Sequence, residues 1–349
     1  VSDIEVADFV ALDLEFSGLF LETERDRRAL DLDTYYEKCV GSIPHFLPLQ
    51  LGVCCARRRP EDGGSWELRA HEFNLWPHER RIFTADLGSL RFLRAHGFDF
   101  NALFESAHPY SRLPKEPAKL GKHTNGHSTH VLSALREAKV PLVFHNGLLD
   151  LMHLYDKFIG DLPAEKEAFS QAWVSNFPLL FDTRLIAQEG RYNVLKHAGG
   201  LSLEELHRHL TSVHPGVMAE GGGGRGGAKG ALNFKRAGPL GSDRPAHGSA
   251  GQDAVITAEV FLMEMDLWIK SEAASSSGGG RKKRRKVVEG DGAGGVSQEE
   301  AAEAEPGGLT AARLLETHRV CQRFHNRLAL VGASPGVLDL GRPPGMLAP

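Results

Sequence analysis

Short hydrophobic runs that end in turn residues alternate with helix-like patterns over residues 1–272 of the chain. A run of about four to eight apolar residues before Gly, Pro or Asn is typical of a buried strand, whereas apolar spacings of three and four are typical of a helix. We therefore predict strands at residues 8–18, 47–56, 66–73, 141–147 and 179–182. We predict helices at residues 89–96, 131–138, 148–158, 183–186, 202–210 and 253–268. Strands that alternate with helices in this way favour an α/β sheet covered by helices.

Two glycine-rich stretches interrupt this pattern. Residues 212–246 and 273–319 contain many glycines, and such stretches cannot bury enough apolar surface to offset the entropy lost on ordering. We predict that the first is an irregular insertion within a domain of residues 1–272 and that the second is a disordered linker. Residues 320–349 would then hold a tail and one strand, near residues 328–340, that returns to the edge of the sheet.

Composition limits the class of protein. The net charge of −4 over 349 residues means that any affinity for nucleic acid must be local. Four cysteines without C-x-x-C spacing argue against a disulfide framework and a Cys-rich zinc site, so we expect a reducing compartment. The chain has neither a signal peptide nor a membrane-spanning apolar run, so we expect a soluble intracellular protein with no membrane partner. Because the chain begins with Val1 rather than Met, we also expect that an N-terminal piece is missing.

Asp13 and Glu15 are two residues apart on the first predicted strand, so both side chains point to the same face. At about 4 Å and an effective dielectric near 20, their repulsion is on the order of 4 kcal/mol, which favours protonation of one acid unless a cation lies between them. Mg²⁺ suits this site because it prefers carboxylate oxygens and water. The alternative is that an isolated D-x-E pair only marks a strand emerging into solvent.

Two further acids lie where they could converge on the same edge of the sheet. Asp150 is in the first turn of the helix after His145-Asn146-Gly147, and Asp253 lies at the start of another helix. Each could instead be an acid that a helix dipole favours at its N-terminus. Asp182 fits a capping role for the helix that follows it, so we place it outside the site.

Four ordered motifs carry a resemblance to a known family. They are residues 9–18 (FVALDLEFSG), 143–153 (VFHNGLLDLMH), 181–187 (FDTRLIA) and 250–257 (AGQDAVIT). The chain resembles the Caf-type DEDD deadenylases, in particular the branch of poly(A)-specific ribonuclease and the target-of-early-growth-response nuclease. The resemblance spans residues 7–272 with gaps, plus the short stretch His325-Asn-Arg-Leu.

The resemblance implies a ribonuclease-H-like mixed sheet flanked by helices and a metal-dependent 3′→5′ exoribonuclease. Asp13, Glu15 and Asp253 would bind a first Mg²⁺ ion, Asp13 would also touch a second, and Asp150 would hold the second through water. Mn²⁺ would substitute for Mg²⁺. The substrate would be RNA with a free 3′ end, either poly(A) or a short tail on non-coding RNA, and the products would be nucleoside 5′-monophosphates.

The expected general base departs from the family pattern. The family places a histidine five residues before the last Asp, where this chain has Gly248, and His247 lies one residue further upstream. We expect the glycine-containing loop to bring the His247 imidazole to the site, where a pKa near 6.5 suits deprotonation of the attacking water. The alternative is a catalytically weakened RNA-binding or scaffold protein. A DNA exonuclease would share the same metal chemistry.

Three other features bear on substrate and location. Phe16 could stack on a terminal base, and His145 or His153 could contact a substrate phosphate, although burial in the core is the competing interpretation for each. The basic run Arg281 to Lys286 in the second linker fits a nuclear import signal or a loose contact with RNA phosphates. We expect an import receptor as a partner and the nucleus, including the nucleolus or nuclear bodies, as the location, with the cytoplasm as the alternative.

Overall fold

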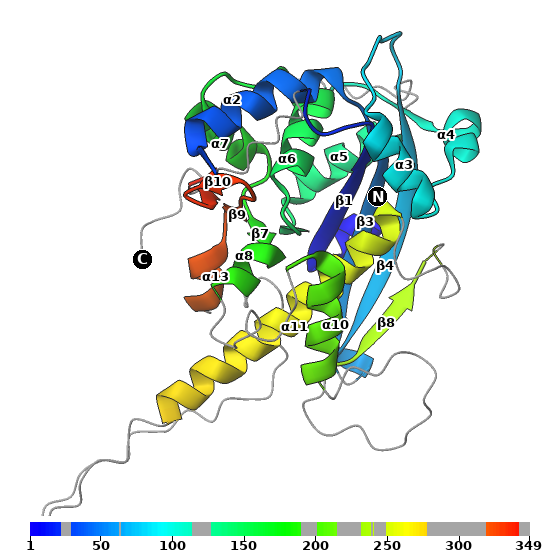
Figure 1. Cartoon of the computed structure of the whole chain (residues 1–349). Helices are drawn as coiled ribbons and strands as arrows, with labels where there is room; N and C mark the ends of the chain where they lie inside the picture. The colour runs from blue at the N-terminus through cyan, green and yellow to red at the C-terminus, as the bar shows by residue number, and fades with distance from the viewer. Residues whose placement is uncertain are drawn as a thin grey trace, which may run out of the picture.

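A central mixed sheet with helices on both faces forms the body of the molecule, as Figure 1 shows for the computed structural model. The structure describes residues 1–21, 29–62, 64–113, 127–189, 201–214, 232–238, 240, 249–277 and 319–341. The sheet contains β1 (Phe9–Phe16), β3 (Pro48–Arg59), β4 (Ser65–Pro77), β5 (His108–Tyr110), β6 (Leu142–Phe144), β7 (Leu180–Asp182) and β8 (Phe234–Ala237).

The strand order is β5-β4-β3-β1-β6-β7, and β8 also pairs with β4. β3 runs antiparallel to both of its neighbours, β1 and β4, whereas β6 and β7 run parallel to β1. Three antiparallel strands followed by two parallel strands are the arrangement of a ribonuclease-H-like sheet. The expected fold class is therefore confirmed.

Two hydrophobic layers cover the sheet. The helices are α1 (Ser2–Glu5), α2 (Leu32–Ser42), α3 (Leu87–Ala95), α4 (Phe100–Ser106), α5 (His127–Ala138), α6 (Leu148–Leu154), α7 (Lys166–Asn176), α8 (Thr183–Gln188), α10 (Leu203–Val213), α11 (Ala250–Ser277) and α13 (Arg319–Phe324). Val10, Leu12 and Leu14 of β1 pack with α2, α5, α6 and α7 on one face. Phe9 and Ala11 pack with α8, α11 and α13 on the other. This alternation follows the strand period of two, so Asp13 and Glu15 lie on the face that α11 covers.

Short elements connect and extend these layers. They are the 3₁₀ turns η1 (Ile43–His45) and η2 (Pro60–Asp62), the π-helical turn η4 (Tyr155–Ile159) and the strands β2 (Leu30–Asp31), β9 (Arg327–Ala329), β10 (Ala333–Ser334) and β11 (Val337–Asp339). None of the helices in the described part of the chain combines the length and the apolar character needed to cross a lipid bilayer.

Two details differ from the sequence predictions. The stretch of residues 212–246 is not irregular throughout, because β8 lies within it and extends the sheet beside β4. The end of the chain does return next to β7, where the Asn326 amide donates to the Leu180 carbonyl at 2.8 Å. Its strands, however, form a separate pair, β9 with β11, and a short bridge from β10 to β2, rather than an edge strand of the main sheet.

Candidate active site

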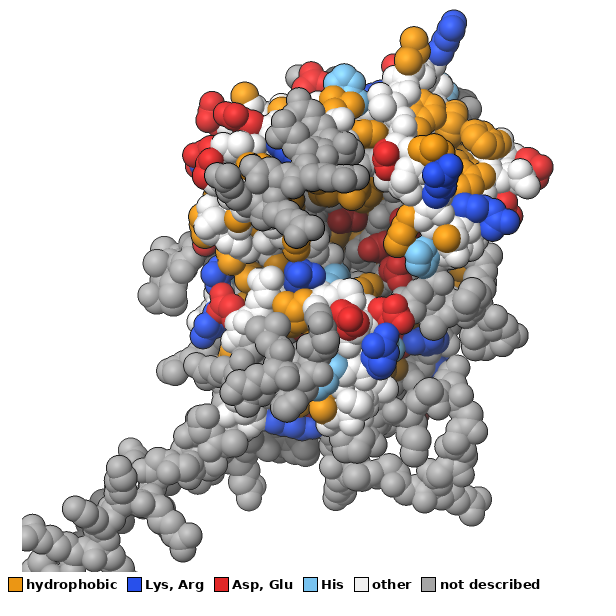
Figure 2. Space-filling view, viewed as in Figure 1, with side chains coloured by type: hydrophobic (Ala, Val, Ile, Leu, Met, Phe, Trp, Pro, Cys, Tyr) orange, Lys and Arg blue, Asp and Glu red, His pale blue; other side chains and the backbone are white. Residues whose placement is uncertain are grey.

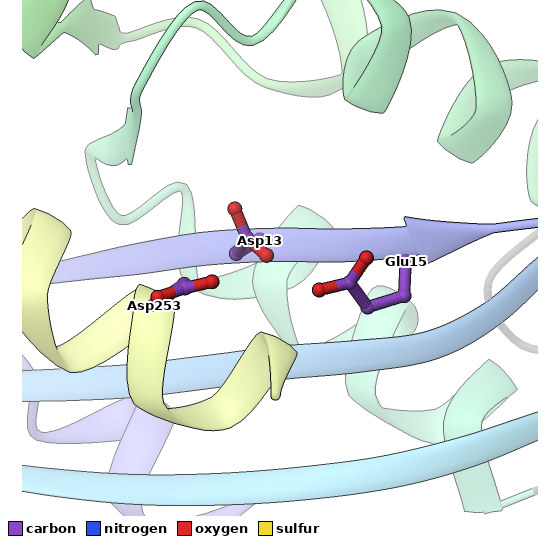
Figure 3. Close-up of side chains that lie close together, drawn as sticks. All are labelled: Asp13, Glu15 and Asp253. Carbon is purple, nitrogen blue, oxygen red and sulfur yellow. The ribbon is translucent and has the colours of Figure 1, made fainter. Parts of the chain in front are cut away.

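Three carboxylates from two elements converge on the face of the sheet under α11. Figure 3 shows Asp13 and Glu15 of β1 and Asp253 of the first turn of α11 pointing toward one another. One carboxylate oxygen of each lies within 4.8 Å of the others. Figure 2 shows acidic side chains at the bottom of a hollow on this side of the molecule. The sequence therefore identified three acids that the fold brings together from residues far apart in the chain.

The start of α11 is held close to the sheet, and this placement brings Asp253 to β1. The Ala250 amide donates to Gln50 Oε1 of β3 at 2.9 Å, and Gln50 Nε2 donates to Asn74 Oδ1 of β4 at 2.9 Å. Gly52, which pairs with Asp13 across the sheet, leaves room for this contact. A Cβ at Gly52 would lie 1.8 Å from the Ala250 carbonyl oxygen.

A fourth acid, Asp150, lies close to these three and contacts the backbone of β1. It lies in the first turn of α6, and its Oδ1 accepts a hydrogen bond from the Leu14 amide at 3.1 Å, between the two β1 acids. Its negative charge also raises the pKa values of Asp13 and Glu15. Asp150 is therefore near both, although it is not one of the three acids with mutually close oxygens.

The electrostatics of this group favour a bound cation. Burial, followed by the charges of Asp253 and Asp150, raises the pKa of Asp13 well above its usual value and that of Glu15 to about 8. Burial also raises the pKa of Asp150 to about 8, against the lowering effect of its backbone hydrogen bonds. Divalent cations favour oxygen ligands of this kind and would reverse these shifts. The donor set thus fits Mg²⁺ or Mn²⁺.

Glu72 is a fifth nearby acid that the sequence did not indicate. It lies on β4 opposite Gly52, and Gly52 in turn pairs with Asp13. Its charge contributes to the raised pKa of Glu15. Only the register of three strands reveals this proximity, so no local motif could have marked it.

Two predicted substrate residues have partners within the protein. The Phe16 ring is partly buried and stacks on the fully buried His153 ring with centroids 4.3 Å apart. The His145 ring nitrogens lie 2.8 Å from Thr183 Oγ1 and 3.0 Å from the Leu201 carbonyl oxygen. Both ring nitrogens of His145 therefore have hydrogen-bond partners within the protein. Contact of Phe16 or His145 with RNA stays a prediction.

The remaining candidates lie outside the described residues. His247 and Gly248, which decide the identity of the general base, fall in the range 241–248, and the basic run Arg281 to Lys286 falls in the range 278–318. The role of His247, nuclear import and nuclear localisation therefore stay predictions from the sequence.

The raised pKa values predict how pH and Mg²⁺ affect stability. Because Glu15 and Asp150 have pKa values near 8 in the fold and near 4 when unfolded, their neutral forms stabilise the folded state at low pH, and this stabilisation is lost as pH rises toward 8. We expect the thermal midpoint of the metal-free protein to fall between about pH 6 and about pH 8.5. Mg²⁺ at about 100 times its dissociation constant should raise the midpoint at the higher pH by roughly 5 to 10 °C. Calorimetry with and without EDTA measures both effects, and an equal midpoint at both pH values without metal would contradict this expectation.

The family model and the relatives that match this chain are all ribonucleases. The model of the CAF1 family ribonucleases matches residues 1–128 and 115–261. The chain is similar to the poly(A)-specific ribonuclease PNLDC1 of Mus musculus, with 42% identity over an aligned length of 289 and with coverage of 52% of this chain and 54% of the relative. It is also similar to the poly(A)-specific ribonuclease PARN of Danio rerio, with 37% identity over 82 residues, 24% of this chain and 12% of the relative.

A third relative acts on another kind of RNA. The pre-piRNA 3′-exonuclease trimmer of Bombyx mori is 41% identical over 58 residues, which cover 17% of this chain and 11% of the relative. Among these three relatives, the chain spans at most about half of the relative's own length.

Proposed function

The chain belongs to the CAF1 family of ribonucleases, and we propose that it is a 3′→5′ exoribonuclease that shortens poly(A) or other short 3′ tails of RNA. The observation that carries this proposal is the convergence of Asp13, Glu15 and Asp253 within 4.8 Å, with Asp150 bound to the backbone between the two β1 acids. Burial raises the pKa values of Asp13 and Glu15, which a fully exposed cluster of acids would not show.

We assign each of the four acids to one or both of two divalent ions. Asp13, Glu15 and Asp253 would hold one divalent ion, and Asp13 together with Asp150 would hold a second. Ions held there would supply the positive charge that activates an attacking water, screens the phosphate oxygens and stabilises the leaving 3′ oxygen. The protein contributes fixed positions, since β1 and α11 are rigid elements and α11 is tied to β3 through Gln50.

The names of the relatives support RNA tails as the substrate class. Two are named as poly(A)-specific ribonucleases and the third as a pre-piRNA 3′-exonuclease. We propose RNA with a free 3′ hydroxyl as the substrate and nucleoside 5′-monophosphates as the products. The acidic side chains in the hollow of Figure 2 are open to the surface, where an RNA strand could reach them.

Trimming of 5′-labelled oligo(A) tests the proposal. We expect Mg²⁺-dependent loss of single nucleotides from the 3′ end, release of 5′-AMP, and no trimming after addition of EDTA. The double variant Asp13→Ala with Glu15→Ala should bind the RNA and leave it intact.

Three outcomes would contradict this proposal. Equal trimming by the wild type and the double variant would remove the enzymatic assignment, and binding without turnover in both Mg²⁺ and Mn²⁺ would favour an RNA-binding scaffold. Faster trimming of oligo(dA) than of oligo(A) would indicate a DNA exonuclease.

A further inference from the structure

Asp182, at the end of β7, has an unusual number of backbone partners for a capping residue. The side chain is fully buried. Its Oδ1 accepts hydrogen bonds from the amides of Asn146 at 3.1 Å, Arg184 at 2.9 Å and Leu185 at 3.3 Å. Its Oδ2 accepts from the amides of Gly147 at 3.3 Å and Ala329 at 3.1 Å.

These five donors come from three separate segments. Arg184 and Leu185 belong to the first turn of α8, and an N-cap side chain ordinarily accepts hydrogen bonds from amides in this turn. Asn146 and Gly147 form the turn between β6 and α6, and Ala329 ends β9. The carboxylate therefore joins the turn before α6, the start of α8 and the returning C-terminal segment at one buried point.

The turn before α6 depends on this support. Asn146 adopts a positive φ of 59°, a backbone conformation that a residue other than glycine adopts at a cost. The turn is also tight, because a Cβ at Gly147 would lie 2.4 Å from Phe144 Cβ. Gly147 is the N-cap of α6 and offers no side chain to hold the helix start. Asp182 of the neighbouring strand instead holds the two residues before the helix, because it accepts from the amides of Asn146 and Gly147.

The position of α6 decides where Asp150 lies. Asp150 is three residues after Gly147, and its Oδ1 reaches the Leu14 amide of β1. A shift of the helix start by a fraction of an ångström would move this carboxylate relative to Asp13. The geometry points to Asp182 as a positioning residue that holds Asp150 in place for the second metal ion and ties that site to the C-terminal segment. This inference rests on the proposed function, although Asp182 itself touches neither the ions nor the RNA.

The carboxylate is needed because both of its oxygens accept hydrogen bonds. All five partners are N–H donors, so each oxygen must act as an acceptor. Asparagine at this position would direct its own N–H groups at some of these amides, and a buried donor facing a donor is left unsatisfied. Asp182→Asn therefore changes hydrogen bonding at almost constant volume.

Calorimetric titration with Mn²⁺ tests the inference without relying on catalysis. We expect the wild type to bind two ions. We expect Asp182→Asn to raise the dissociation constant of the weaker ion at least about tenfold, as loss of a residue that orients a metal ligand does, and to leave the tighter ion within about threefold. A chain that is merely less stable would lose both ions in proportion to its folded fraction.

Asp99→Asn is the matched control. Asp99 caps α4 by accepting from the amides of Asn101 and Ala102, as Asp182 does for α8, but it holds no part of the site. This variant should bind both ions as the wild type does. Combining Asp182→Asn with Asp150→Asn should weaken the second ion no further than Asp150→Asn alone, because residues that act through one another are not additive.

The outcomes separate the inference from the function it rests on. If the wild type trims RNA and Asp182→Asn keeps its affinity for the second ion, or if the two substitutions are additive, the inference is overturned. Should Asp182→Asn fail to fold, Ala329→Pro removes one of the five donors, and unchanged binding of the second ion in that variant overturns it as well. A wild type that binds no Mn²⁺ and trims no RNA removes the proposed function first and this inference with it.

Discussion

Asp253→Asn is expected to slow Mg²⁺-dependent trimming of oligo(A) by at least about 1,000-fold, since ionic stabilisation of the transition state is worth several kcal/mol and about 1.4 kcal/mol corresponds to tenfold in rate. Asp253 contributes the acid of the three-acid group that comes from α11, and asparagine keeps its shape while removing the charge that would bind an ion. The effect should appear in the single-turnover rate at saturating RNA. Higher Mg²⁺ should recover only part of it.

Glu259→Gln is the matched control on the same helix. Glu259 is also buried, but it pairs with His207 and Arg236 on the α10 and β8 side of α11. Its replacement should lower the thermal midpoint while the rate per folded molecule stays within about threefold, because it removes a partner from a buried ion pair rather than a metal ligand. Trimming by Asp253→Asn at a rate close to that of Glu259→Gln would contradict the assignment of Asp253.

Gly52→Ala is expected to reduce trimming on the order of 100-fold, although no atom of Gly52 belongs to the donor set, because a misplacement of about 1 Å costs that much. The added Cβ would lie 1.8 Å from the Ala250 carbonyl oxygen and 2.6 Å from the Gly251 amide nitrogen, so the start of α11 must move away from β3. Asp253 moves with it. Single-turnover trimming together with a thermal midpoint separates the catalytic loss from a loss of stability.

Gly41→Ala provides the comparison for this substitution. Gly41 lies in α2, and a Cβ there would meet nothing within 4 Å. Alanine at this position should stabilise the protein by about 0.5 to 1 kcal/mol and leave trimming unchanged. Equal activity of the two glycine variants would show that close approach of α11 to β3 does not set the position of Asp253.

Local patterns in the sequence were sufficient for the elements that carry the acids. The period of two along β1 correctly placed Asp13 and Glu15 on one face, and turn residues correctly marked the start of α6 before Asp150. The apolar pattern after Asp253 predicted the helix that became α11, although the helix is longer than expected. Capping of α8 by Asp182 is confirmed as well.

Contacts between distant segments were beyond the reach of such patterns. Gln50 and Gly52 are unremarkable in a run of buried β3 residues, and only the register with β1 and the approach of α11 gives them a role. The proximity of Glu72 to Glu15 likewise depends on two successive strand pairings. A strand pairing of this kind is set by tertiary packing, which one sequence does not reveal.

The strand partners of the C-terminal segment also could not be predicted from the sequence. Its apolar residues predicted a strand that returns to the sheet, but they could not indicate its partner. The segment pairs with itself through β9 and β11, and Asn326 anchors it by accepting from the Leu180 amide at 2.9 Å and donating to the Pro178 carbonyl at 2.9 Å. The link from Ala329 to Asp182, and so to the turn before Asp150, follows from that anchoring.

Anomalous diffraction from crystals grown with Mn²⁺ can decide whether the four acids hold two metal ions, because it locates the ions without reference to activity. We expect one peak bounded by the carboxylates of Asp13, Glu15 and Asp253 and a second peak about 4 Å away, on the side of Asp150. Manganese bound elsewhere, with no peak among these four acids at saturating concentration, would contradict it.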